Sequence, residues 1–353
     1  MSSVYIEYDG QRVDVLELMR HIVNHEVASQ YSPWFFTYYA DLTGQGYMSK
    51  YLSFLRKLLR VPGQRPLSRG GHLSGQDVLD AGCGFGIMAT LMALMGAQQV
   101  HGIDCHQRMI DTFRTYLAIL PYQLPLYPRL GDVAAMPYED GSFDLVLSHE
   151  AISHYLNVDG FMAESYRVLR PGGRLIVSDS NNALNRKVFK DAREVWRAFE
   201  EGPATDDIHG HRVERSFLEQ RAMIIGGDFP SLPARDVALL AKHTSGLWGR
   251  GLRESIESYI QSGRLPGHVY SEGTCPVDPV QGYYVERLLD PHELKVQLET
   301  FGFEARVTAY LGGARGGLLS AANDLLTCRR LTRLVLPFAR AYRILAIKPG
   351  NTS

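Results

Sequence analysis

The sequence has few of the features that mark a secreted, membrane-spanning or nucleic-acid-binding protein. Its 353 residues include four cysteines without a CxxC pair, so we expect neither a disulfide framework nor a cysteine-rich metal site. No run of 18 apolar residues occurs, and residues 1–10 carry acids rather than an apolar stretch, so neither a membrane span nor a signal peptide is predicted. The formal net charge of -1 argues against a nucleic-acid partner. A cytoplasmic protein is expected.

What is present is an alternation of short apolar runs with helical segments. From residue 77 the strand-like runs are, in order, DVLDA, VHGID, FDLVLS and GRLIVSD. A helical pattern at 87–96 separates the first run from the second, and another at 107–120 separates the second from the third. Strands that alternate with helices indicate a parallel sheet, and buried parallel strands are continuously apolar, as these are. The RPGG sequence, with Pro171, Gly172 and Gly173, predicts a turn before the strand at 174–179.

The chain divides into four predicted parts. Residues 1–60 read as a helical N-terminal segment, 77–180 as a Rossmann-like core, 181–288 as a long insertion, and 289–353 as the end of the core. The expected fold class is α/β: a mostly parallel seven-stranded sheet with helices on both faces, plus a large helical insertion. A helix at 318–336 and a last strand, YRILAI, are expected to close the chain.

The most informative segment is VLDAGCGFG, residues 78–86, where a strand enters a glycine-rich turn that opens a helix. Such a turn lets the backbone approach a ligand closely, and a helix N-terminus favours anionic groups. A dinucleotide fingerprint needs a third glycine where this chain has Ile87. Asp80 precedes the turn, where it would repel a pyrophosphate and attract an ammonium group. Asp104 ends the next strand, where an acid can accept hydrogen bonds from both ribose hydroxyls.

A ligand with an adenosine ribose, an ammonium group and no phosphate fits these features, and S-adenosylmethionine (SAM) is such a ligand. The motifs VLDAGCGFG, GID, GDVAAMPYEDGSFDLVLSHE and RVLRPGGRLIVSD follow one another over about residues 77–180. In this order they resemble the class I SAM-dependent methyltransferases that act on small molecules.

The resemblance implies roles for the matching positions. Gly82, Cys83 and Gly84 would line the methionine part of SAM, and Met109 would pack on the adenine. Asp132 would accept from the adenine amino group while Val133 donates its backbone N–H, and His149 would line the pocket. Cys105 stands after the ribose acid, where the family more often has an apolar residue.

Catalytic residues are less clearly marked than cofactor residues. Glu150 and His154 lie near the expected transfer point, and either can act as a general base, although methyl transfer often needs only positioning. Asp206, Asp207, His209 and His211 share one loop, but no second cluster completes a metal site, so no metal is predicted. A basic helix face is formed by Arg329, Arg330 and Arg333.

The insertion and the aromatic N-terminal segment are expected to form a lid over the strand ends. Its aromatic residues suggest an apolar or aromatic small-molecule acceptor: Trp196, Phe199, Trp248, Tyr270, Tyr283 and Tyr284. The sequence leaves the acceptor atom and the oligomeric state open. Two alternatives also stay open: an NAD-binding oxidoreductase, and a SAM-binding regulatory protein without catalysis.

Overall fold

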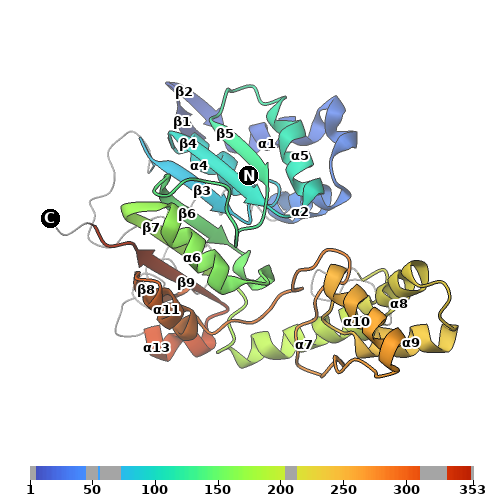
Figure 1. The fold of residues 1–353 in the computed structure, drawn as a ribbon. Helices are drawn as coiled ribbons and strands as arrows, with labels where there is room; N and C mark the ends of the chain where they lie inside the picture. The colour runs from blue at the N-terminus through green and yellow to red at the C-terminus, as the bar shows by residue number, and fades with distance from the viewer. Residues whose placement is uncertain (1–4, 45–54, 56–72, 203–212, 311–331, 351–353) are drawn as a thin grey trace. The chain divides into compact units, whose positions relative to one another are not determined.

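The chain folds into two compact units. The structure, a computed structural model, describes residues 5–44, 55, 73–202, 213–310 and 332–350 (Figure 1). The first unit, here called the sheet unit, comprises Met1–Ile152, Asn157–Ser180 and Pro291–Ser353. The second, here called the insert unit, comprises Ser153–Leu156 and Asn181–Asp290. Each unit is described by itself below.

A seven-stranded sheet with the order β5-β4-β3-β6-β7-β9-β8 forms the centre of the sheet unit (Figure 1). Its strands are β3 (Asp77–Ala81), β4 (Gln99–Asp104), β5 (Leu126–Leu130), β6 (Phe143–His149), β7 (Leu169–Asp179), β8 (Glu304–Tyr310) and β9 (Ala341–Ile347). The first five strands in this order are parallel, while β9 runs antiparallel to both β7 and β8. This confirms the predicted mostly parallel α/β fold.

Both faces of the central strands are covered. Val78 and Leu79 are neighbours on β3, so their side chains point to opposite faces, and both are fully buried. Beyond the N-terminal segment, the described helices of this unit are α4 (Ile87–Leu94), α5 (Gln107–Leu117), α6 (Val158–Val168), α11 (Pro291–Thr300) and α13 (Thr332–Val335), with the 3-10 turn η3 (Leu336–Phe338). The 3-10 turn η2 (Ile152–His154) begins in this unit and ends in the insert unit. The α4 helix is buried at every position, which explains why its sequence has no polar face.

The N-terminal segment differs from the helical prediction. It begins with a hairpin of β1 (Tyr5–Tyr8) and β2 (Gln11–Asp14), joined at Asp9 and Gly10, which both have positive φ. An Asp-Gly pair is a strong hairpin signal because it adopts this turn readily. Helical structure follows as α1 (Val15–Asn24), η1 (Glu26–Gln30) and α2 (Pro33–Gly44), and α1 begins where the Asp14 side chain accepts from two backbone N–H groups.

The RPGG segment also differs from its prediction. Pro171, Gly172 and Gly173 do not precede the strand but lie inside β7, which begins at Leu169. The pairing of β6 and β7 shifts register between Phe143 and Leu145, and Gly172 has φ +80°. The turn is therefore accommodated by an irregularity in the β6–β7 pairing and does not end the strand.

The insert unit is helical, with α7 (Arg186–Glu201), α8 (Phe217–Asp228), α9 (Ala234–His243) and α10 (Gly249–Ser262). One of its apolar clusters contains the buried Trp196 with the half-buried Phe199 packed against it, so both aromatics contribute to the packing of the unit itself. Arg221 and Glu200 form a buried ion pair between α8 and α7, and Arg221 also donates to Ala241 O at 3.0 Å.

The two ends of the insert lie side by side. Asn182 and Leu289 form an isolated parallel bridge, in which Leu289 N–H donates to Asn181 O at 3.1 Å and Ala183 N–H donates to Leu289 O at 3.1 Å. The chain between them, about a hundred residues, therefore closes on itself.

Several predicted features fall outside the described residues. These are the cluster of Asp206, Asp207, His209 and His211, the residues Arg329 and Arg330, and most of the helix expected at 318–336. Arg333 lies in α13 and is exposed. Across the parts of the chain that the structure describes, no helix is both long and apolar enough to span a bilayer.

Candidate active site

The glycine-rich turn lies where the parallel strand β3 ends and α4 begins. Gly84 has φ +52° and Gly86 has φ +75°, a region that side chains with a Cβ rarely adopt. Gly82 N–H and Cys83 N–H both donate to Ile103 O, at 2.9 and 3.1 Å, and this fixes the turn against β4. The turn therefore presents backbone to the carboxyl edge of the sheet, the edge at which open α/β sheets bind ligands.

Asp104 connects this turn to the end of β4. Its Oδ2 accepts the Gly84 N–H at 2.9 Å, and its Oδ1 accepts the His106 N–H at 2.8 Å. These two bonds fix the orientation of the carboxylate at the end of β4. The structure thus brings the predicted ribose acid directly beside the glycine turn.

Asp80 is a buried carboxyl group on the same edge. Its side chain is 2% exposed, and among the described residues no donor reaches its Oδ2. Burial raises the pKa of Asp80 to about 7; a hydrogen bond from the Ala89 backbone opposes the shift, and the nearby Asp104 charge adds to it. An unsatisfied buried carboxyl oxygen is costly unless a cationic group or donor reaches it.

The remaining cofactor candidates lie around this pair of acids. Met109 Sδ would be 3.8 Å from a Cβ added to Gly84, so α5 borders the turn on one side. Asp132 follows β5 and its Oδ1 accepts the Ala134 N–H at 2.8 Å, while Val133 is buried. Cys105 follows β4 and is exposed as a residue. Partial burial of its thiol, and then the charges of Asp104 and Asp132, raise its pKa to about 11, so the thiol stays protonated.

Cys83 takes part in the turn through its backbone, because its side chain points into the protein. The thiol is buried, and a Cβ on Gly102 would lie 3.0 Å from its Sγ. Burial raises the pKa of Cys83 well above its usual value, with the charges of Asp104 and Asp80 adding to the shift. A buried neutral thiol is unreactive, so this cysteine serves packing.

His149 ends β6 at the same edge as the turn. Burial lowers its pKa to about 4, and a hydrogen bond to the Ser178 carbonyl only partly opposes the shift. The imidazole is therefore neutral at physiological pH and can line a pocket without adding charge.

The two predicted base candidates lie in different units. Glu150 belongs to the sheet unit, has φ +49°, and accepts at Oε2 from Ser180 Oγ at 2.5 Å and Ser180 N–H at 3.1 Å. His154 belongs to the insert unit, with its Nδ1 2.8 Å from Tyr284 O. Because a carbonyl only accepts, Nδ1 carries the proton and Nε2 is the basic nitrogen.

The aromatic helix α2 packs beside the glycine turn. The rings of Phe35 and Phe85 are 5.4 Å apart, Tyr38 and Phe85 are 6.2 Å apart, and Trp34 lies 5.5 Å from His106. Phe35 is fully buried, whereas Trp34 and Tyr38 are exposed. One side of this helix is therefore core, and the other presents aromatic surface next to the candidate site.

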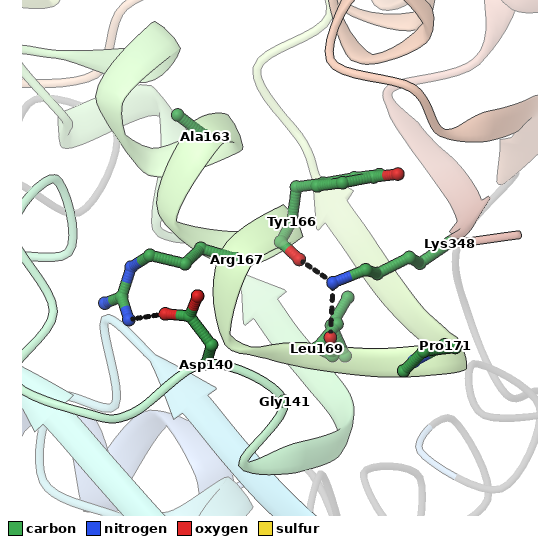
Figure 2. Close-up of a pocket in the computed structure, with 8 residues that line it drawn as sticks. All are labelled: Asp140, Gly141, Ala163, Tyr166, Arg167, Leu169, Pro171 and Lys348. Carbon is green, nitrogen blue, oxygen red and sulfur yellow. Dashed lines mark hydrogen bonds and ion pairs between the residues drawn. The ribbon is translucent and has the colours of Figure 1, made fainter. Parts of the chain in front are cut away.

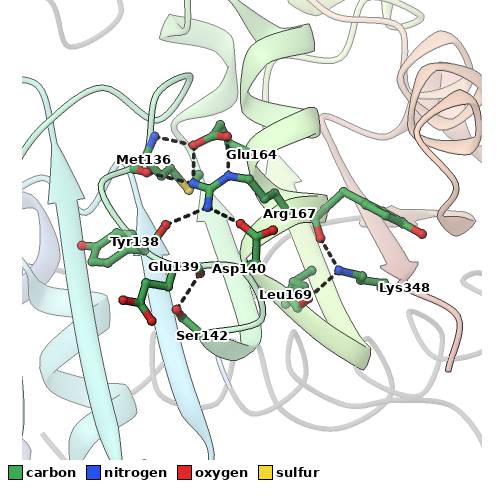
Figure 3. A network of polar contacts seen from close by, with 10 residues as sticks. Met136, Tyr138, Glu139, Asp140, Ser142, Glu164, Arg167, Leu169 and Lys348 are labelled. Carbon is green, nitrogen blue, oxygen red and sulfur yellow. Dashed lines mark hydrogen bonds and ion pairs between the residues drawn. The ribbon is translucent and has the colours of Figure 1, made fainter. Parts of the chain in front are cut away.

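A hollow of about 480 Å³ lies at the opposite edge of the sheet (Figure 2). There Lys348 Nζ donates to Tyr166 O at 2.8 Å and to Leu169 O at 2.7 Å. Arg167 donates to Glu164, to Asp140 and to the backbone oxygens of Met136 and Tyr138, as Figure 3 shows. Both cations are thus held by structural bonds at the amino edge of the parallel strands, and we assign this network to stability.

Comparison with known proteins finds a family match for the central part of the sheet unit. Residues 79–177 match the family described as methyltransferase domain. Over 195 residues the chain is 32% identical to an uncharacterized 37.1 kDa protein in transposon Tn4556 of Streptomyces fradiae, covering 54% of each chain. It is 30% identical to a demethylmenaquinone methyltransferase of Symbiobacterium thermophilum, over 35% of this chain and 51% of that one. A ubiquinone biosynthesis O-methyltransferase of Sinorhizobium medicae is 36% identical over 35% of this chain and 48% of its own. The chain therefore spans about half the length of the curated relatives it matches.

Proposed function

We propose that this chain, whose residues 79–177 match the methyltransferase domain family, is a class I SAM-dependent enzyme that transfers a methyl group from SAM to a small-molecule acceptor. The observation that carries the proposal is Asp80. A buried carboxyl group with an unsatisfied oxygen, beside a glycine turn, fits a cationic amino group and would repel a pyrophosphate.

The residues around Asp80 fit the rest of SAM. Asp104, oriented by two backbone N–H groups, would accept from the ribose hydroxyls, and Gly84 would let the methionine part approach the turn. Met109, Asp132 and Val133 would surround the adenine, and His149 would line the pocket as a neutral ring.

SAM supplies an electrophilic methyl group on a sulfonium, and an acceptor lone pair displaces it in line. The work of this chain is to hold both partners in that geometry and to exclude water. Where the acceptor loses a proton, the Nε2 of His154 or the carboxylate of Glu150 is the proposed base.

The alternatives make different predictions about turnover. An oxidoreductase would bind NADH in place of SAM, and a regulatory protein would bind SAM without producing S-adenosylhomocysteine. Competition between radiolabelled SAM and NADH for the protein distinguishes the oxidoreductase from the methyltransferase. Formation of S-adenosylhomocysteine with quinol-like or aromatic acceptors distinguishes an enzyme from a regulatory protein. If no acceptor in a broad panel gives S-adenosylhomocysteine, the proposed catalytic activity is wrong. The net charge of -1 supports a small-molecule acceptor over a nucleic acid.

Asp80 makes SAM binding dependent on pH. Its pKa of about 7 means that the free protein holds a proton there at pH 6. An ammonium group beside it lowers that pKa, so binding at pH 6 should release up to about one proton. Affinity should consequently rise as pH increases from about 5.5 to 7.5, by at most about tenfold per unit below the pKa.

Calorimetry in two buffers of different ionisation enthalpy measures this proton release. Asp80→Asn has a similar shape but cannot ionise, so its proton release and pH slope should disappear. If the variant releases the same proton, Asp80 is not the group beside the ammonium.

The lid is part of the same proposal. Trp34 and Tyr38 on α2 are exposed beside the glycine turn, which supports a role for α2 as the N-terminal part of the lid. Residues 181–288 would form the rest of the lid. Hydrogen exchange in α2 and in the insert unit should slow when S-adenosylhomocysteine and an acceptor are added together. Slowing confined to residues 77–150 would argue against a lid.

A further inference from the structure

The segment formed by α13 and η3, just before β9, carries two very exposed apolar side chains. Phe338 is 82% exposed and Leu334 is 69% exposed, more than any other large apolar side chain within the described ranges. Leu334 lies about one helical turn before Phe338, and Pro337 next to it is exposed as well. Single exposed apolar residues are common on proteins, but neighbouring ones of this size indicate a binding surface.

The opposite side of the same segment fixes it to the sheet unit. Leu336 and Ala339 are fully buried, and Ala339 N–H donates to Val335 O at 3.0 Å and to Leu336 O at 3.1 Å. Both α13 and η3 pack against β8 (Figure 1). Because Leu336 and Ala339 already fill the inward positions, Leu334 and Phe338 cannot turn into the core without displacing them.

Two guanidinium groups flank these apolar side chains. Arg333 and Arg340 are exposed, and neither forms a hydrogen bond or an ion pair with a described residue. Residues 325–353 contain six lysine and arginine residues and no acid, although the net charge of the whole chain is -1. Asp179, which pairs with Tyr342 at this end of the sheet, is fully buried. The exposed apolar side chains therefore lie between cations that have no counter-charge in the described parts of the chain.

The size and the charge of this surface favour a lipid bilayer over a protein partner. Leu334 and Phe338 together expose on the order of 300 Å², whereas a stable protein interface takes about 800 Å² from each partner. In a two-fold contact with a second copy, Arg333 and Arg340 of one chain would meet the same cations of the other. Binding to a bilayer surface instead grows with each buried apolar group and with attraction to anionic lipids.

The surface lies at the edge of the sheet that carries the candidate active site. Tyr342, at the start of β9, pairs with Asp179 at the carboxyl end of β7. The glycine turn follows the carboxyl end of β3, which is parallel to β6 and, through it, to β7. A bilayer bound at α13 and η3 would therefore lie at the edge where open α/β sheets bind their ligands.

We propose that α13 and η3 bind the surface of an anionic lipid bilayer. Phe338 and Leu334 enter the boundary between headgroups and acyl chains, and Arg333 and Arg340 contact the lipid phosphates. The apolar stems of both arginines can lie along that boundary while their guanidinium groups stay in the polar layer. The chain lies on the bilayer without crossing it, and added salt weakens the binding because it screens the cations.

Sedimentation of the full chain with sucrose-loaded vesicles tests this proposal. The chain should bind vesicles of phosphatidylcholine mixed with phosphatidylglycerol at millimolar lipid, and bind pure phosphatidylcholine at least about tenfold more weakly, since each arginine contributes about fivefold on an anionic surface. Phe338→Ala should weaken binding to the anionic vesicles about tenfold or more, because most of the buried apolar area is lost. The double variant Arg333→Gln with Arg340→Gln should lose the preference for anionic lipid.

Matched controls remove the same kinds of side chain elsewhere in the sheet unit. Val296→Ala on α11 removes an apolar side chain that is 58% exposed, and Arg114→Gln on α5 removes an exposed cation, so both should bind vesicles as the parent does. Circular dichroism and SAM binding are measured on the same samples. If Phe338→Ala fails to fold, Leu334→Ala tests the same surface and should also weaken binding.

Three results would overturn the proposal: no binding to the anionic vesicles, equal binding to both kinds of vesicle, or unchanged binding by a folded Phe338→Ala. A dimer that Phe338→Ala dissociates, found together with no vesicle binding, would assign the surface to a second copy of the chain. The vesicle experiment does not depend on methyl transfer, so its outcome is separate from that of the proposed function.

Discussion

Gly86→Ala should destabilise the sheet unit by about 2–5 kcal/mol, combining the usual cost of overpacking a core with that of a left-handed residue bearing a Cβ. A Cβ at this position would lie 2.2 Å from Cε1 of Phe113. Phe113 is fully buried and stacks on Tyr116 at 5.3 Å, and the Tyr116 hydroxyl donates to Phe85 O at 2.6 Å. The ring therefore has no open space into which to move.

Urea unfolding followed by circular dichroism measures this loss. Gly84→Ala is the matched control, since Gly84 also has positive φ but, among the described residues, its added Cβ would meet only Met109 Sδ at 3.8 Å. The free energy of unfolding of this control should fall by about 1–2 kcal/mol, which is the cost of a left-handed backbone conformation for a residue with a Cβ. Equal losses in both variants would show that the contact with Phe113 is not the cause. The double variant Gly86→Ala with Phe113→Leu should recover part of the loss.

Asp104→Ala should weaken SAM binding by about 1.5–3 kcal/mol, roughly 10- to 150-fold, because the hydrogen bonds lost are made to a charged group. Asp104→Asn keeps one acceptor oxygen, so its affinity for SAM should lie between that of Asp104→Ala and that of the parent protein. Since Asp104 also holds the backbone of Gly84 and His106, thermal unfolding of each variant must accompany the calorimetry.

Asp111→Ala provides the control for Asp104. Asp111 is an exposed acid on α5 whose partners are Gln107 and Arg114, so its removal should leave SAM affinity unchanged. An Asp104→Ala protein that is folded and binds SAM normally would remove the ribose assignment.

The sheet and its cofactor edge were predictable because they depend on local patterns. Continuous apolar runs predicted the parallel strands, and Asp80 and Asp104 each stand near the end of such a run. Carboxyl ends of neighbouring parallel strands meet at one edge, so both acids lie at the edge that carries the glycine turn. The Asp104–Gly84 hydrogen bond places Asp104 directly beside that turn.

Features that depend on distant pairing were not predictable. Arg343 reads as a polar residue in a strand, and only the pairing of β9 with both β7 and β8 shows that it lies on an internal strand. His154 is held by Tyr284, 130 positions later in the chain, and no local pattern connects them. Strand β5 contains Pro128, which favours an edge strand but obscures the strand pattern.

The bridge between Asn182 and Leu289 has a consequence for how this chain can change over evolutionary time. Because the entry and the exit of the insert meet, the entropy of closing that long excursion depends only weakly on its length. Helices can be added, removed or exchanged there without altering the spacing of the strands that flank it. If the insert forms the lid proposed above, acceptor preference can diversify by recombination of this one contiguous segment, while the residues proposed to hold SAM are inherited intact.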